Sequence, residues 1–174
     1  MLDAERRRGG RRKAREIVMR VLYESEITGD DPREILSLAF GRFRLTEEGR
    51  RYAEELMRRC QRHRARLDEG IRSHLRNWSL ERVGVVERAI LRMAATELLY
   101  VKTTPARVIL DEALRLARRY GAPQSCSFVN GVLDALGRSA RPKELSGGGA
   151  RPSDPQAGSD GPGRAGPGAA DPSN

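Results

Sequence analysis

Apolar residues recur along most of the chain at the spacing of an α-helix. In RRKAREIVMRVLYE, positions 11–24, they fall at i, i+3, i+4, i+7 and i+8, which would give a helix one apolar face. These residues are Ala14, Ile17, Val18, Val21 and Leu22. The same spacing returns in 86–98, 109–120 and 128–136. We therefore expect a series of helices, each burying one stripe of side chains.

Residues typical of helix ends divide this pattern. Asp31 followed by Pro32 predicts an N-cap with proline at the first helical position, so a short helix should run from there to about residue 40. Thr46 predicts the cap of the next helix, which should break before Leu67. Each of these signals is local. They indicate how many helices there are more firmly than they indicate the exact residue at which each helix begins or ends.

Later signals of the same kind predict three more helices. Ser79 is a suitable N-cap for the helix of 86–98, and Thr104 with Pro105 marks the start of the next, which Gly121 closes. The last helix should end near Gly137. Six or seven helices with short connections predict a compact all-α bundle.

Composition agrees with this fold and limits the folded region. Aromatic residues make up only 5% of the 174 residues, which favours helices over sheets. The segment 146–174 is rich in glycine and proline and has no aromatic or branched aliphatic side chain, so we expect a disordered tail. Residues 1–10 look like a flexible basic arm, which leaves 11–140 as one helical domain.

Charge is the strongest functional signal. The net charge is +9, and residues 1–20 hold eight bases against three acids. The run RRRGGRRKAR at 6–15 contains no acid, although cations at a helix start oppose the helix dipole. Such a run can neutralise the phosphates of RNA, or enter a minor groove of DNA. A solvated charged terminus is the alternative interpretation.

Signals for catalysis are weaker. Cys60 and His63 lie three positions apart, but too few further ligands follow for a metal site. Glu97 and Glu112 lie in apolar stripes, and we expect each to be paired with an arginine or a helix N-terminus rather than to act as an acid or base. We therefore expect no enzyme activity, no cofactor and no small-molecule substrate.

The location follows from features of the whole sequence. Two widely spaced cysteines suggest neither a disulfide framework nor a zinc site. The first residues, MLDAERRRGG, have no apolar core of a secretion signal, and no apolar run is long enough to span a membrane. We expect a cytoplasmic protein without membrane contact.

Five stretches together closely resemble the NusB family of transcription antitermination factors. They are RRKAREIVMRVLYE, WSLERV from residue 78, VERAILRMAATELL from 86, ARVILDEALRLARRYG from 106 and FVNGVLD from 128. The resemblance covers about 11–136 and implies an all-helical RNA-binding bundle. It also implies binding to box A RNA of nascent ribosomal RNA transcripts, together with small-subunit ribosomal protein S-ten, in the elongating RNA polymerase complex.

The resemblance also implies which residues meet RNA. Its arginine-rich motif falls on Arg11, Arg12, Lys13 and Arg15. Tyr23 matches a family aromatic near the RNA face, and Gln124 and Phe128 border the same face. From the residues alone a second function stays open, that of a helical protein–protein adaptor whose basic arm binds nucleic acid without specificity.

Overall fold

The computed structural model describes residues 2–75 and 78–145, and every regular element in them is helical. In chain order the elements are α1 (Leu2–Thr28), α2 (Pro32–Arg42), α3 (Glu47–Arg62), α4 (Arg64–Arg72), a 3-10 turn η1 (Leu80–Arg82), α5 (Val85–Tyr100), α6 (Ala106–Tyr120), α7 (Ser125–Ala140) and the short α8 (Pro142–Leu145). The predicted all-α bundle is confirmed, with more helices than the six or seven expected. The tail 146–174 lies outside the described residues.

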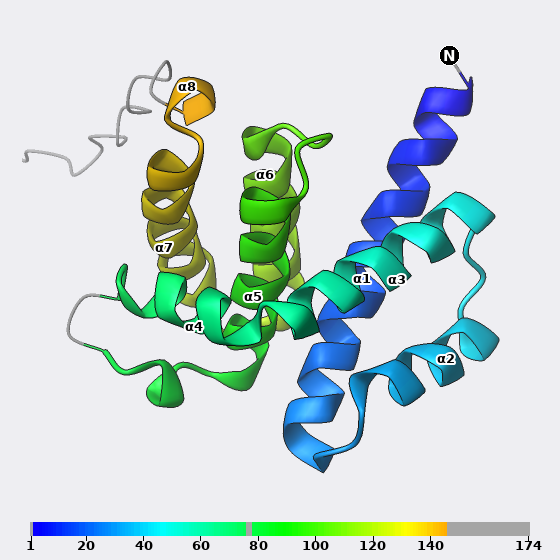
Figure 1. The fold of residues 1–174 in the computed structure, drawn as a ribbon, viewed down its shortest axis with the longest axis horizontal. Coiled ribbons are helices and arrows are strands. Elements are labelled where there is room, and N and C mark those ends of the chain that lie inside the picture. Colours follow the sequence, from blue (N-terminus) through cyan, green and yellow to red (C-terminus); the bar gives the residue numbers. More distant parts are fainter. Residues whose placement is uncertain (1, 76–77, 146–174) are drawn as a thin grey trace, which may run out of the picture.

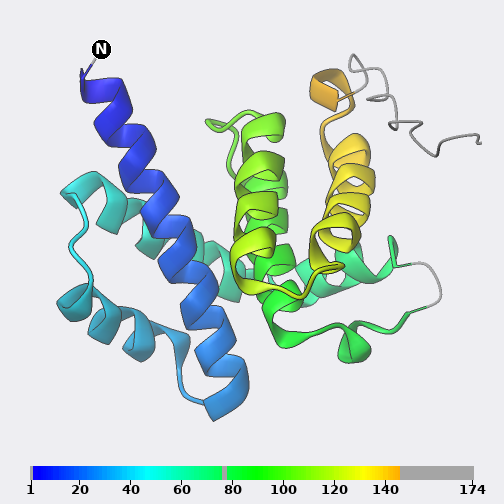
Figure 2. The ribbon, with the colours of Figure 1, turned by 180° about the vertical axis from the view of Figure 1, so that it is seen from behind.

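Helix α5 is the centre of the bundle. Every side chain from Ala89 to Leu98 is buried, because α1, α3, α4, α6 and α7 all pack against this helix. A helix segment that is buried on all sides must be apolar nearly all round, and the stretch from Ala89 to Leu98 departs from this only at Arg92, Thr96 and Glu97. In Figure 1, α5, α6 and α7 stand side by side, α4 crosses in front of their lower ends and α3 crosses in front of α1. Seen from behind, α1 runs diagonally across the other side (Figure 2).

Helix α1 begins earlier than the sequence predicted. We expected 1–10 to be a loose arm, but the helix starts at Leu2 and continues through Gly9 and Gly10. Glycine disfavours a helix interior, yet at Gly10 it permits a close crossing with α3, where an added Cβ would lie 2.8 Å from Thr46 Oγ1. Packing of α1 on α3 therefore supports a helix in part of the region that composition suggested was loose.

The predicted caps are confirmed in two of three cases. The side chain of Asp31 accepts a hydrogen bond from the backbone N–H of Arg33, and that of Thr46 accepts one from Gly49 N–H. The prediction for Ser79 was wrong. Ser79 precedes the turn η1 and makes no capping hydrogen bond, and α5 begins only at Val85. A short turn thus separates the capping residue from the helix it was expected to start.

The C-terminal end of the described chain closes the bundle. Arg141 is buried and donates to the carbonyl oxygens of Glu97, Leu98 and Thr104 at 2.7 to 2.8 Å. These groups belong to the end of α5 and the following turn, where helix carbonyls lack partners. Glu144 accepts from the N–H of Ala106 at 2.7 Å and so caps α6. Helix α7, the last helix that the sequence predicted, extends to Ala140, past its predicted end at Gly137.

Candidate nucleic-acid interface

Three of the four predicted basic residues lie at the surface of α1. Arg12 has a side chain that is 54% exposed, Lys13 is exposed and Arg11 is partly exposed. The guanidinium of Arg11 lies 3.5 Å from a Glu48 carboxylate oxygen. Exposed guanidinium and ammonium groups on one helix can contact successive phosphates of a nucleic acid. These three side chains are exposed as the sequence predicted, but they lie in the interior of α1, which begins at Leu2, and not at a helix start.

Arg15 is the exception, and the structure corrects its expected position. The prediction placed it off the apolar stripe and exposed, but its side chain is 4% exposed. Its Nε and Nη2 donate to the two carboxylate oxygens of Glu97 at 2.7 and 2.8 Å. The hydroxyl of Tyr52 lies against both groups. In this arrangement the guanidinium of Arg15 faces α5 and is not available to a phosphate at the surface.

The environment of Arg15 keeps it charged. Burial alone would lower the pKa of the Arg15 guanidinium, but the hydrogen bonds and the charge of Glu97 raise that pKa above its usual value. Burial and the Glu97 charge also raise the pKa of Tyr52, so its phenol stays protonated. The expectation that Glu97 is a paired structural acid is confirmed. Arg15 and Glu97 form a buried ion pair that joins α1 to α5.

Glu112 on α6 forms a second ion pair with α1, nearer the surface. Its carboxylate accepts from Arg12 Nε at 2.9 Å and from Arg115 Nε at 3.0 Å. Burial raises the pKa of Glu112, but these two arginines lower it more, so the net pKa is below the usual value. The prediction of a paired acid is again confirmed. Glu112 also holds the stem of Arg12 against α6, which orients an otherwise mobile side chain.

Tyr23 lies elsewhere on α1. It is 41% exposed and lines a pocket of about 560 Å³ with Arg20, Val86 and Tyr120. Arg20 donates to the Tyr120 hydroxyl at 2.9 Å, so the two edges of this pocket are joined. Eleven residues separate Tyr23 from Arg12, which corresponds to roughly 16 Å along a helix. Tyr23 therefore lies further along α1, toward its C-terminal end, and is separate from the basic group formed by Arg11, Arg12 and Lys13.

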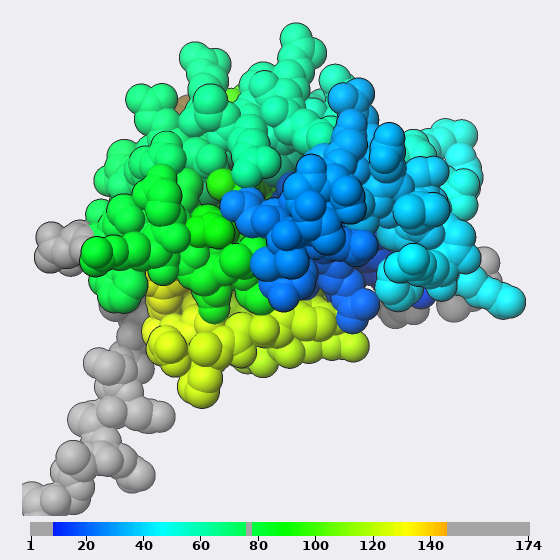
Figure 3. Space-filling model, turned by 90° about the horizontal axis from the view of Figure 1, so that it is seen from below, coloured from blue at the N-terminus to red at the C-terminus, as the bar shows by residue number. Residues whose placement is uncertain are grey.

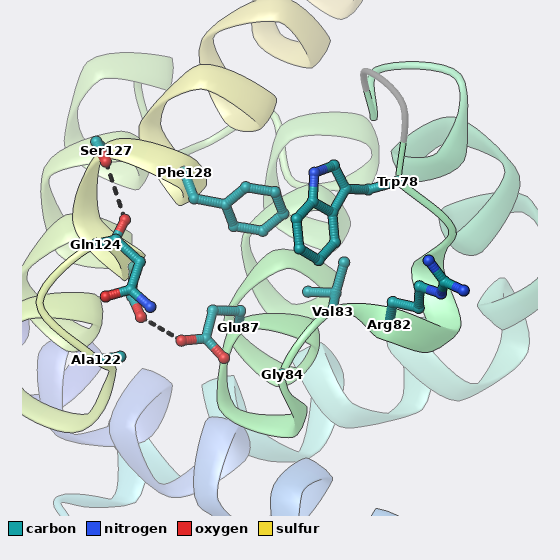
Figure 4. Close-up of a pocket in the computed structure, with 10 residues that line it drawn as sticks. Trp78, Arg82, Val83, Gly84, Glu87, Ala122, Gln124, Ser127 and Phe128 are labelled. Carbon is teal, nitrogen blue, oxygen red and sulfur yellow. Dashed lines mark hydrogen bonds between the residues drawn. The ribbon is translucent and has the colours of Figure 1, made fainter.

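Gln124 and Phe128 lie together at the start of α7. Gln124 is exposed, Phe128 is partly buried, and both line a separate pocket of about 560 Å³. Trp78 and Val83 line the opposite side of this pocket, and Glu87 lies between the two sides, nearer to Gln124, as the close-up shows (Figure 4). In the view from below, the C-terminal part of α1 lies beside the segment around residues 80–90, with the α6–α7 connection next to them (Figure 3).

Sequence reasoning did not assign Trp78 or Arg82 to this site. Trp78 was used only as the first residue of one stretch that resembles the family, although an exposed tryptophan is itself a signal for binding. The predicted residues thus form a basic group on α1 and two aromatic pockets, and not a single cluster. Among the described residues, no three potential ligands of a metal ion lie close enough to bind one. None of the described helices has the length and apolar character to cross a membrane.

A helical bundle with a basic group on one helix and exposed aromatic pockets has the features of the class of nucleic-acid-binding helical proteins. The family is defined by comparison. The NusB family model matches residues 12–138, and the chain belongs to the NusB family of transcription antitermination proteins.

Known relatives support this assignment. A transcription antitermination protein NusB of Salinibacter ruber is 43% identical over 128 residues, which cover 72% of this chain and 79% of the relative. The solved structure of T. maritima NusB has a TM-score of 0.72 and 34% identity, covering 78% of this chain and 96% of that one. A structure described as antitermination factors NusB and NusE in complex with dsRNA has a TM-score of 0.69 and 29% identity, covering 75% and 97%.

Proposed function

We propose that this protein is a non-catalytic RNA-binding antitermination factor. It binds the box A element of nascent ribosomal RNA transcripts together with ribosomal protein S-ten, and the complex acts on elongating RNA polymerase. The observation that carries the proposal is the exposed basic group Arg11, Arg12 and Lys13 on a bundle of the NusB family. A relative's structure described with NusE and dsRNA supports both an RNA ligand and a protein partner.

Affinity and sequence preference come from different types of contact with the RNA. Basic side chains on phosphates give affinity and orientation but little sequence information. Sequence preference must come from bases that stack or hydrogen-bond, and Tyr23, Gln124 and Phe128 offer such groups. The protein alone should therefore bind box A RNA only modestly better than a scrambled RNA. Ribosomal protein S-ten completes the surface that holds the remaining bases.

Fluorescence anisotropy tests the proposal directly. Box A RNA and a scrambled RNA of equal length are titrated with the protein, with and without S-ten, at one salt concentration. We expect S-ten to increase the affinity for box A more than for the scrambled RNA, and RNA to tighten the protein pair by the same factor. Equal enhancement on both RNAs would instead favour the adaptor function, in which the basic helix attracts nucleic acid without specificity.

A further inference from the structure

The only tryptophan of the chain stands at the edge of the pocket at the start of α7. Trp78 is 60% exposed, although tryptophan is highly buried on average. The indole and the ring of Phe128 extend toward one another from opposite walls, with Val83 between and below them (Figure 4). So large an exposed apolar surface contributes little to folding. It is suited to stacking on a flat ligand.

Polar groups surround these rings. The hydroxyl of Ser125 donates to Glu87 Oε1, which fixes the carboxylate beside the pocket. The second oxygen, Oε2, lies so near Gly84 that an added Cβ there would be 2.1 Å away. Arg82 is exposed, and its guanidinium makes no hydrogen bond or ion pair with another described residue. The pocket therefore combines two aromatic surfaces, one oriented acceptor and one cation at its edge.

We propose that this pocket holds one unstacked nucleobase of the bound RNA, and that Trp78 is its stacking residue. Single-stranded RNA is recognised through bases that stack on aromatic side chains and are read along their edges. Glu87 accepts a hydrogen bond from the exocyclic amino group of the base, as carboxylates do from cytosine. Arg82 contacts the phosphate next to that base. The assignment rests on the proposed RNA-binding function and adds a residue and a base preference to it.

The acceptor predicts which bases fit. Adenine and cytosine carry an exocyclic amino group on the edge used for pairing, and uracil carries a carbonyl oxygen there. A carboxylate attracts the first two and repels the third. The pocket should therefore prefer adenine or cytosine to uracil. Replacing Glu87 by glutamine supplies a donor as well as an acceptor, so Glu87→Gln should reduce the preference while leaving the stacking surface in place.

The experiment uses the full chain with short RNAs of one length made only of A, C or U. Binding is measured by anisotropy of the labelled RNA and, independently, by the intrinsic fluorescence of Trp78, which no other tryptophan obscures. The variants are Trp78→Ala, Trp78→Phe and the control Leu38→Ala, which alters an equally exposed apolar residue on α2. Circular dichroism and melting temperature show whether each variant keeps its fold.

We expect the A and C oligonucleotides to quench Trp78 fluorescence. Trp78→Ala should weaken their binding roughly tenfold or more, while Trp78→Phe keeps most of the affinity and Leu38→Ala changes nothing. Tight binding with unchanged fluorescence, or equal affinities for Trp78→Ala and Leu38→Ala, would overturn the assignment but leave the proposed function intact. If S-ten quenched Trp78 fluorescence in the absence of RNA, the pocket would bind the protein partner and not a nucleobase. Wild-type protein that binds no RNA, with or without S-ten, would overturn both proposals.

Discussion

Lys13 and Arg15 are two positions apart in one basic run, yet they have different surroundings. Lys13 is exposed, whereas Arg15 is paired with a fully buried Glu97 on a helix 82 positions away in sequence. Apolar spacing alone places both residues off the apolar face of the helix. It contains no information about the side chains of neighbouring helices, and so it cannot show that Glu97 on α5 pairs with Arg15. The basic run therefore has two roles, and only the tertiary structure separates them.

Replacing each residue by alanine should separate these roles experimentally. Arg15→Ala leaves the Glu97 carboxylate buried without its cation, so we expect the free energy of unfolding to fall by about 3–5 kcal/mol. Lys13→Ala should change it by less than about 0.5 kcal/mol, since it removes an exposed side chain. Urea denaturation of both variants measures the difference. Similar small losses in both would mean that the Arg15–Glu97 pair contributes little to stability.

The pairing of Glu112 predicts a pH dependence. Its pKa in the folded protein is lowered by Arg12 and Arg115, so it binds a proton more weakly folded than unfolded. Its contribution to stability is then complete above the unfolded value of about 4.3 and is lost as the pH falls through the lower folded pKa. Glu112→Gln should be less stable than wild type at pH 7 by about 2 kcal/mol.

This difference between wild type and Glu112→Gln should shrink as the pH falls below about 4. Chemical denaturation at a series of pH values measures it. The matched control is Glu54→Gln, because Glu54 is exposed on α3. A difference between wild type and Glu112→Gln that stays constant down to pH 3 would contradict the assigned cause.

At the scale of elements, two adjacent glycines in α1 have different surroundings. An added Cβ at Gly9 has nothing within 4 Å, whereas at Gly10 it would lie 2.8 Å from the Oγ1 of Thr46, the atom that caps α3. Gly9→Ala should stabilise the protein by up to about 1 kcal/mol through helix propensity. Gly10→Ala should lose that gain because it displaces the cap. Thermal unfolding of the pair checks this, and equal stabilisation by both would show that the crossing tolerates a side chain.

Local rules explain why some elements could be predicted and others could not. Asp31 and Thr46 were identified because a capping hydrogen bond joins residues two or three apart, so its signal is contained in a short segment. Ser79 carries the same signal, but the turn η1 follows it and α5 starts later. The pocket of Trp78 and Phe128 joins residues from distant elements, and no short segment indicates that they meet.

At the scale of the whole molecule, the described chain ends in a structural contact. Arg141 and Glu144 bind the ends of α5 and α6, while 146–174 has the composition of a disordered tail. Truncation after Leu145 should leave the melting temperature and RNA affinity nearly unchanged. Truncation after Ala140 should lower the melting temperature by several degrees, because helix carbonyls and an N–H lose their partners. Equal melting temperatures for the two truncations would contradict the role given to Arg141.

The burial of Arg15 also changes what the basic helix can contribute to RNA binding. Of the four basic residues in the predicted motif, only Arg11, Arg12 and Lys13 are exposed enough to neutralise phosphates, so the variant with these three replaced by alanine is the informative one. Each neutralised phosphate contributes roughly 0.7 to the slope of log K against log salt for single-stranded RNA. We expect the slope to flatten by about 2 units in this variant. The melting temperature should also fall, because the variant lacks Arg12, one of the two arginines that pair with Glu112.

Anisotropy titrations at four or more salt concentrations measure this slope. Adding Arg15→Gln to the triple variant serves as the control, because a glutamine there carries no charge and cannot reproduce the two-point pairing with Glu97. We expect that fourth change to lower stability and to leave the salt slope equal to that of the triple variant. A further flattening of about 0.7 would mean that Arg15 leaves Glu97 and contacts a phosphate when RNA binds. The buried Arg15–Glu97 ion pair would then exist only in the free protein.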